Sequence, residues 1–119
     1  MTRAAPQVDA FGGGGFRLSG DWRTGSVLIL DDVAHPWPVA SAAGLSVETL
    51  APVLKAGPAV SELLVLGMGA SNALPPREVR QAFLTAGLGL EFLDTPAAAR
   101  LYNLLTSEGR RVAAALIAV

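Results

Sequence analysis

The chain has 119 residues, of which 51% are hydrophobic and 16% are charged, and its formal net charge is -1. One domain fits this length, and the apolar content is too high for a disordered chain. The balanced charge argues against a nucleic-acid-binding protein, while one histidine and no cysteine argue against a metal centre or a disulfide.

The first part of the chain predicts short strands and turns that feed one sheet. Residues 12–15 are four glycines, which destabilise a helix, so we expect a bend and then an edge strand at residues 16–18. The apolar run at residues 26–30 predicts a buried strand. Two prolines flank Trp37, so residues 35–39 predict an extended edge strand or a loop.

Residues 46–55 are expected to be helical. If Ser46 were the N-cap, Pro52 would lie deep enough in the helix to kink it. With Thr49 as the N-cap, Pro52 falls in the first turn, where proline is tolerated. We therefore expect a turn first and a helix capped by Thr49.

The second half alternates strands and helices. Three apolar runs predict strands, at residues 62–67, 89–93 and 112–119. Residues 75–86 carry apolar side chains at helical spacing, which predicts an amphipathic helix. A strand, helix, strand, helix, strand order predicts parallel pairing through helical crossovers.

A second helix of this half is expected after Asp94, with Thr95 as its N-cap and Pro96 at its first helical position. The chain is thus predicted to be one α/β domain over residues 1–119 around a mixed sheet, with residues 1–8 as a candidate disordered segment.

No secretory signal or membrane helix is predicted. The N-terminal residues lack a long apolar stretch, and the longest apolar run is well short of the ~20 residues that a membrane helix needs. We expect a cytoplasmic protein that does not insert into a membrane. Its near-zero net charge leaves little electrostatic barrier to a homodimer or to a protein partner.

The loop that follows residues 62–67 is a candidate ligand site. Ligands of open α/β sheets bind at the carboxyl ends of strands, and glycines let backbone N–H groups approach an anion. Asn72 stands where a dinucleotide-binding fingerprint has its third glycine, and Asp94 stands roughly where the ribose-binding acid would be. The alternative interpretation is a tight turn without a ligand.

Arg100 and Asn103 share one face of the last helix. This face is either solvent-exposed or part of an anion site beside the loop. The candidate ligand-binding residues are Gly67, Met68, Gly69, Asn72, Arg77, Asp94, Thr95, Arg100 and Asn103. No catalytic residues, metal ligands or cofactor are predicted.

The stretch EFLDTPAAARLYNLLTSEGRRVAAAL, residues 91–116, carries a family pattern. The matching residues are Glu91, Asp94, Thr95, Ala97, Ala98, Arg100, Tyr102, Asn103, Glu108 and Arg110. Together with an alanine-rich final strand, they resemble the family of mitochondrial respiratory complex I assembly factor three and its uncharacterised bacterial relatives. Met68 and Leu101 stand where that family usually has threonine, which weakens the expectation of a polar ligand.

The resemblance implies a three-layer α/β/α fold with a mixed central sheet and no established catalytic activity. It implies an accessory or adaptor role through contact with a protein partner, such as a membrane-complex assembly factor. The location would be the bacterial cytoplasm, or the periphery of the inner membrane through that partner.

Trp37 is the candidate partner contact, because rigid aromatic side chains often anchor interfaces. The alternative is that Trp37 covers the sheet. The alternative function is a small-anion-binding or nucleotide-binding protein, or a weak enzyme, that uses the loop at residues 67–72 with Arg100 and Asn103.

Overall fold

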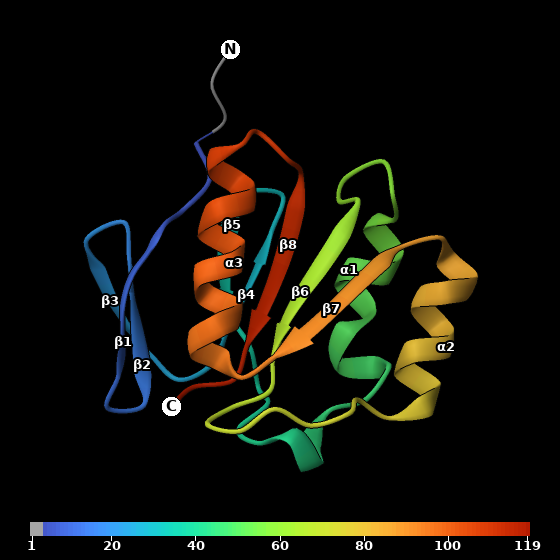
Figure 1. Cartoon of the computed structure of the whole chain (residues 1–119), viewed down its shortest axis with the longest axis horizontal. Helices are drawn as coiled ribbons and strands as arrows, with labels where there is room; N and C mark the ends of the chain where they lie inside the picture. The colour runs from blue at the N-terminus through green and yellow to red at the C-terminus, as the bar shows by residue number, and fades with distance from the viewer. Residues whose placement is uncertain (1–3) are drawn as a thin grey trace.

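A mixed five-stranded sheet forms the centre of the computed structural model, which describes residues 4–119 (Figure 1). Its strands are β4 (Val27–Leu30), β5 (Val33–Pro36), β6 (Leu63–Gly67), β7 (Gly89–Leu93) and β8 (Val112–Leu116), in the order β5-β4-β8-β6-β7. Strand β6 pairs in parallel with both β7 and β8, whereas β4 is antiparallel to β5 and β8. The predicted strands of the second half and their parallel pairing are confirmed, except that the last strand ends at Leu116 and not at residue 119.

Helices cover both faces of this sheet. The crossover helices are α2 (Arg77–Ala86), between β6 and β7, and α3 (Thr95–Ser107), between β7 and β8. Helix α3 lies on one face, and α2 lies on the other with the short helix α1 (Ala51–Ala56) (Figure 1). Two 3-10 turns, η1 (Ala42–Gly44) and η2 (Glu48–Leu50), precede α1. The chain therefore has the predicted three-layer α/β/α fold.

The first strands form a separate sheet, which corrects the expectation that they feed the central one. The strands β1 (Val8–Gly12), β2 (Gly15–Leu18) and β3 (Asp21–Thr24) pair in that order, all antiparallel. Strand β2 is therefore a central strand and not an edge. Phe16 belongs to the same buried apolar cluster as Val27 and Ile29 of the five-stranded sheet, so the small sheet helps α3 to cover this face.

The N-caps of α1 and α3 differ from the predicted ones. The N-cap of α1 is Leu50, and the Thr49 hydroxyl instead bonds the backbone of Ser46, although Pro52 does fall in the first turn. The N-cap of α3 is Asp94, whose Oδ1 accepts a hydrogen bond from the N–H of Ala97 at 2.9 Å. A carboxylate is a strong N-cap acceptor, and this shift of one residue leaves the buried Thr95 hydroxyl available for other contacts.

Helix α2 begins at Arg77, two residues later than predicted, because Pro76 has an extended backbone. It ends where expected, with Gly87 in the left-handed conformation that glycine adopts without strain.

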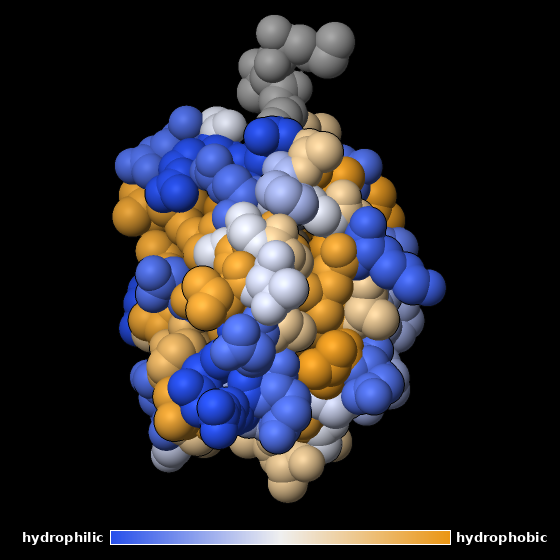
Figure 2. All heavy atoms as spheres, turned by 90° about the vertical axis from the view of Figure 1, so that its right-hand side faces the viewer, coloured by the Kyte–Doolittle hydropathy of each residue, from blue (hydrophilic) through white to orange (hydrophobic). Residues whose placement is uncertain are grey.

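The side of the molecule that carries α2 shows hydrophobic patches interspersed among hydrophilic side chains (Figure 2). Leu84 of α2 is 73% exposed, and other large exposed apolar side chains are spread over several elements. Single exposed apolar side chains are normal on a protein surface and do not by themselves mark an interface.

Candidate functional site

The predicted loop is tied to α3 and to the chain after β8 through Thr95. The Thr95 Oγ1 accepts a hydrogen bond from the Gly69 N–H at 2.9 Å and donates one to the Ile117 carbonyl at 2.7 Å. The N–H of Met68 donates to the carbonyl of Leu93 at 2.8 Å. These two loop N–H groups, which an anion would need, are therefore already bonded within the chain.

The glycines of this loop have structural roles. A Cβ added at Gly67 would lie 2.9 Å from Thr95 Oγ1 and 3.1 Å from both Thr95 Cα and Leu116 Cδ2. Gly69 has a φ of 102°, in the region where only glycine is free of strain. Close packing and turn geometry thus explain both glycines without a ligand, which favours the tight-turn interpretation.

The polar face of α3 holds the chain's own N-terminal segment. Asn103 binds both backbone groups of Val8, with its Oδ1 2.9 Å from the N–H nitrogen and its Nδ2 2.9 Å from the carbonyl oxygen. The Tyr102 hydroxyl donates to the carbonyl of Pro6 at 2.8 Å, and Gln7 Nε2 donates to Thr106 Oγ1 at 3.3 Å. We call this set of contacts the α3 clamp.

The α3 clamp changes two expectations. Asn103 is neither simply solvated nor directed to an anion, since it pairs with Val8 as a neighbouring strand would. Hydrogen bonds join α3 to Pro6, Gln7 and Val8, so this part of the candidate disordered segment is ordered. Residues 1–3 of that segment lie outside the described residues.

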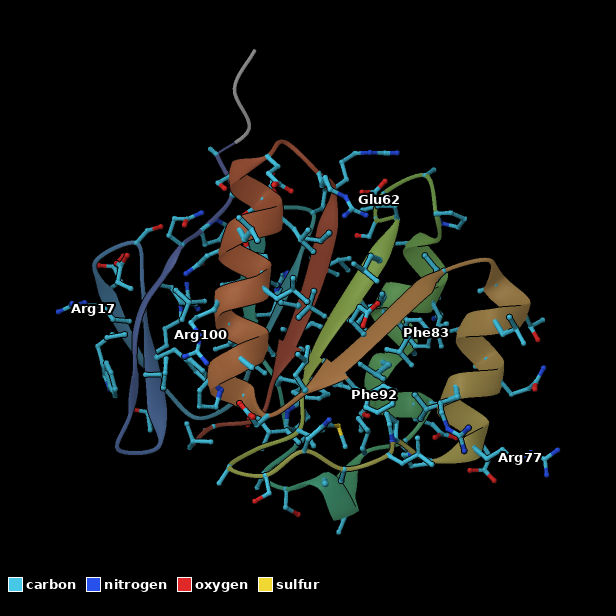
Figure 3. The ribbon with its side chains drawn as sticks, viewed as in Figure 1. Arg17, Glu62, Arg77, Phe83, Phe92 and Arg100 are labelled. Atoms are coloured by element: carbon cyan, nitrogen blue, oxygen red, sulfur yellow. The ribbon has the colours of Figure 1, made fainter. Side chains whose placement is uncertain are left out.

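The remaining candidate residues do not converge. Asp94 caps α3, and Asn72 Nδ2 donates to the Phe92 carbonyl at 3.3 Å. Arg77 begins α2 and Arg100 lies on α3, on opposite faces of the sheet (Figure 3). The structure brings together the loop, Asp94 and Thr95 but not these two arginines. Anion binding at the loop stays a prediction.

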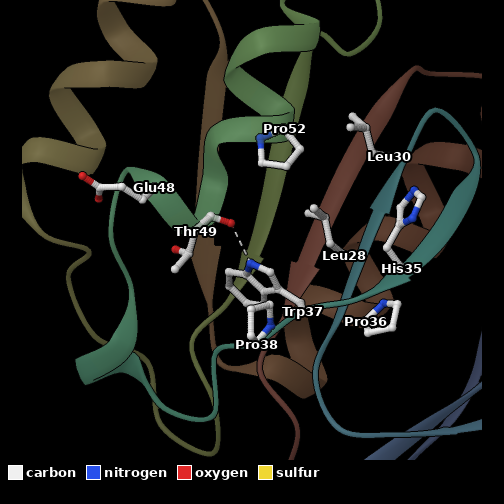
Figure 4. Close-up of a pocket in the computed structure, with 9 residues that line it drawn as sticks. All are labelled: Leu28, Leu30, His35, Pro36, Trp37, Pro38, Glu48, Thr49 and Pro52. Carbon is white, nitrogen blue, oxygen red and sulfur yellow. Dashed lines mark hydrogen bonds between the residues drawn. The ribbon is translucent and has the colours of Figure 1, made fainter.

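A second site, which the sequence analysis missed, is an apolar hollow at the β5 edge of the central sheet. Its volume is about 560 Å³, and it is lined by Leu28, Leu30, His35, Pro36, Trp37, Pro38, Glu48, Thr49 and Pro52. It lies between η2 and α1 on one side and β4 and β5 on the other (Figure 4). We call it the edge groove.

The edge groove follows from how the two faces of the sheet are covered. Alternate side chains of β4 point to opposite faces, so Ile29 packs under the small sheet while Leu28 and Leu30 face the α1 side. Helix α1 has only six residues, and an open hollow remains between it and these two leucines.

Trp37 does not have the exposed position that the partner-contact interpretation assumed. Its side chain is only 5% exposed, and its indole N–H donates to the Thr49 carbonyl at 2.8 Å. The alternative, that Trp37 covers the sheet, describes its burial correctly. The same hydrogen bond joins the two walls of the edge groove, so Trp37 shapes the groove from its base (Figure 4).

The groove offers hydrocarbon surface and few polar groups. None of its nine described lining residues is Lys or Arg, and its titratable groups are His35 and Glu48. Within residues 4–119 there is no group of three or more His, Cys, Asp or Glu side chains placed to hold a metal ion. This lining suits the binding of an apolar group better than acid–base or metal chemistry.

Nothing in the sequence pattern alone marks this groove. Leu28 and Leu30 look like ordinary core residues of a strand, and Pro52 looks like a helix-start residue. Their common hollow arises only when β4 and α1 are placed side by side. The one signal near the groove was the Pro-Trp-Pro segment, since Trp37 lines it, and a partner contact of Trp37 stays a prediction. In the described part of the chain, no helix has the length and apolar character required to cross a bilayer.

Residues 8–117 match the family described as "Protein of unknown function (DUF498/DUF598)". An uncharacterized protein of Rhodobacter capsulatus is 38% identical over 110 residues, which are 92% of this chain and 82% of that protein. The zebrafish (Danio rerio) NADH dehydrogenase [ubiquinone] 1 alpha subcomplex assembly factor 3 is 37% identical over 103 residues, which are 87% of this chain. The match spans only 59% of that assembly factor, so the vertebrate relative is substantially longer.

A solved structure has the same fold over the whole chain. The crystal structure described as an outer membrane protein from Bartonella henselae superposes with a TM-score of 0.90 at 28% identity. It covers 100% of this chain and 99% of the other. The fold and the family match therefore agree over nearly the full length.

Proposed function

The chain belongs to the DUF498/DUF598 family, and from this premise we propose that it is a non-catalytic accessory protein that binds a protein partner in the assembly of a membrane complex. Relatives named as complex I assembly factors support an assembly-factor-like role. The partner would then be a component of such a complex or another assembly factor. The protein would act in the bacterial cytoplasm, and the partner would bring it to the periphery of the inner membrane.

The edge groove is the observation that carries this proposal. It is an apolar hollow at the open edge of a sheet. Its described lining residues include no hydrogen-bonded pair of an acid and a base, no activated nucleophile and no lysine or arginine, which are the groups that would suggest a reaction. Val33 of β5, which pairs in register with the groove residue Leu30, is also exposed. Apolar surface of this kind, rimmed by polar groups, is typical of a site that a partner covers.

A capture experiment with matched variants tests the proposal. The tagged chain is expressed in the organism that encodes it, and captured membrane proteins are identified by mass spectrometry. Leu30→Gln places an amide in the groove, whereas Leu104→Gln changes a leucine that is 55% exposed on the α3 face. We expect the wild type and Leu104→Gln to capture respiratory-complex or assembly proteins. Leu30→Gln should capture about tenfold less of the same proteins.

Two outcomes would contradict the proposal. One is capture of no respiratory or membrane-assembly protein by the wild type. The other is equal capture by the two variants, provided that circular dichroism shows both to be folded. The predicted homodimer is checked on the same samples by light scattering, and it is independent of the groove.

A further inference from the structure

The polar groups inside the edge groove are mostly already bonded within the chain. The Trp37 indole N–H donates a hydrogen bond to the Thr49 carbonyl oxygen. The Thr49 hydroxyl accepts from the Ser46 N–H at 3.1 Å and donates to the Ser46 carbonyl at 2.7 Å. A molecule in the groove could therefore form polar contacts only with His35 and Glu48 among the lining side chains.

Glu48 is an exposed carboxylate that forms no hydrogen bond or ion pair with the residues described, 4–119. No lysine or arginine lines the groove to neutralise it. Asp31, a second exposed acid, directly follows Leu30 in the turn between β4 and β5. Among the described residues that line the groove, Glu48 is the one acid, and its negative charge disfavours an anionic occupant such as a fatty acid or a nucleotide.

Glu48 also borders a second hollow. This one has a volume of about 320 Å³ and is lined by Leu45, Ser46, Val47, Glu48, Pro76, Glu78 and Val79. It adds a second exposed carboxylate, Glu78, on the far side of Glu48. Arg77 neighbours Glu78 in the chain but lines neither hollow. Glu48 thus stands where two partly apolar hollows meet.

We propose that the edge groove and this second hollow bind a partner-protein segment in which a basic residue is flanked by apolar residues. This inference rests on the proposed function and names the chemistry of its partner. The apolar side chains occupy the two hollows, and the arginine or lysine between them pairs with Glu48. Burial of the apolar side chains supplies affinity. The charge pair supplies selectivity, because an acidic residue in place of the arginine or lysine would be repelled by Glu48 and Glu78.

A titration with two matched peptides tests the inference. The probes are acetyl-Ser-Leu-Arg-Leu-Ser-amide and the same peptide with glutamate in place of arginine, and binding is followed by NMR shifts of the labelled chain. We expect shifts at Leu28, Leu30 and the Trp37 indole, and a Kd about tenfold lower for the arginine peptide, because attraction replaces repulsion at an exposed site.

Charge reversal supplies the control. Glu48→Lys should invert the preference between the two peptides, while Glu108→Lys, at the end of α3 on the other face, should leave it unchanged. Equal Kd values for the two peptides in the groove would overturn the charge inference and leave groove docking intact. Absence of shifts at Leu28, Leu30 and Trp37 with both peptides would overturn both. The capture experiment remains a separate test of the accessory role.

Discussion

Thr95 connects three parts of the chain through one buried hydroxyl. It joins the start of α3 to the loop after β6 and to the residues that follow β8. Both of its hydrogen-bond partners are backbone groups in the interior, where an unpaired N–H or C=O is costly.

Thr95→Val should therefore be strongly destabilising although the two side chains have the same shape. It leaves the Gly69 N–H and the Ile117 carbonyl without their partner, and we expect a loss of about 2–4 kcal/mol in the free energy of unfolding. Urea denaturation measures this loss. Thr95→Ser keeps the hydroxyl and should cost about 1 kcal/mol. Equal losses for the two variants would show that the hydrogen bonds are unimportant.

Gly67→Ala tests the close approach of β6 to α3. The added methyl would overlap Thr95 and Leu116, so we expect a loss of about 1–3 kcal/mol. The control is Gly44→Ala, where the new Cβ would make an ordinary contact of 3.9 Å with Val39. That variant should be neutral or slightly stabilising in the same denaturation assay. A harmless Gly67→Ala would argue that the loop can move, and would weaken the tight-turn interpretation relative to anion binding.

The start of α3 shows which features of single residues could be predicted from the sequence. A helix start after β7 was evident from the Asp-Thr-Pro sequence, because each of these residues favours a helix N-terminus. The N-cap was assigned one residue too late, since both Asp and Thr can cap and their order alone does not decide between them. The second role of Thr95 depends on Gly69 and Ile117, which are distant in sequence.

At the scale of elements, the α3 clamp makes β1 depend on α3. Asn103 replaces a missing neighbouring strand by bonding both backbone groups of Val8. The sequence did place Arg100 and Asn103 on one face of this helix. It could not show that the face binds residues 6–8, because the contact spans 95 residues of chain.

Asn103→Leu should loosen β1 while leaving the central sheet folded. Loss of both hydrogen bonds should speed hydrogen exchange at the Val8 amide by about tenfold or more, whereas amides of β6 and β8 should change much less. Asn103→Asp keeps an acceptor for the Val8 N–H and should give an intermediate rate. Uniform acceleration across all strands would instead indicate that β1 and the sheet unfold as one unit.

At the scale of the whole molecule, the two faces of the central sheet differ in how they are covered. The α3 face is completed by the small three-stranded sheet, and the opposite face is left open beside β4 and β5. The parallel pairing followed from the alternating elements of the second half, and the three-layer arrangement was implied by the family resemblance. The separate small sheet did not, because strand patterns do not say which strands pair, and the edge groove depends on that arrangement.

The most direct measurement of partner docking at the edge groove is site-specific photo-crosslinking in living cells. A photoreactive phenylalanine analogue replaces His35, which is exposed and lines the groove, or Leu104, which is exposed on the α3 face. If the partner docks in the edge groove, a respiratory-complex or assembly protein should be crosslinked from position 35 and none from position 104. The same crosslinks from both positions, or crosslinks from position 104 alone, would contradict docking in the groove.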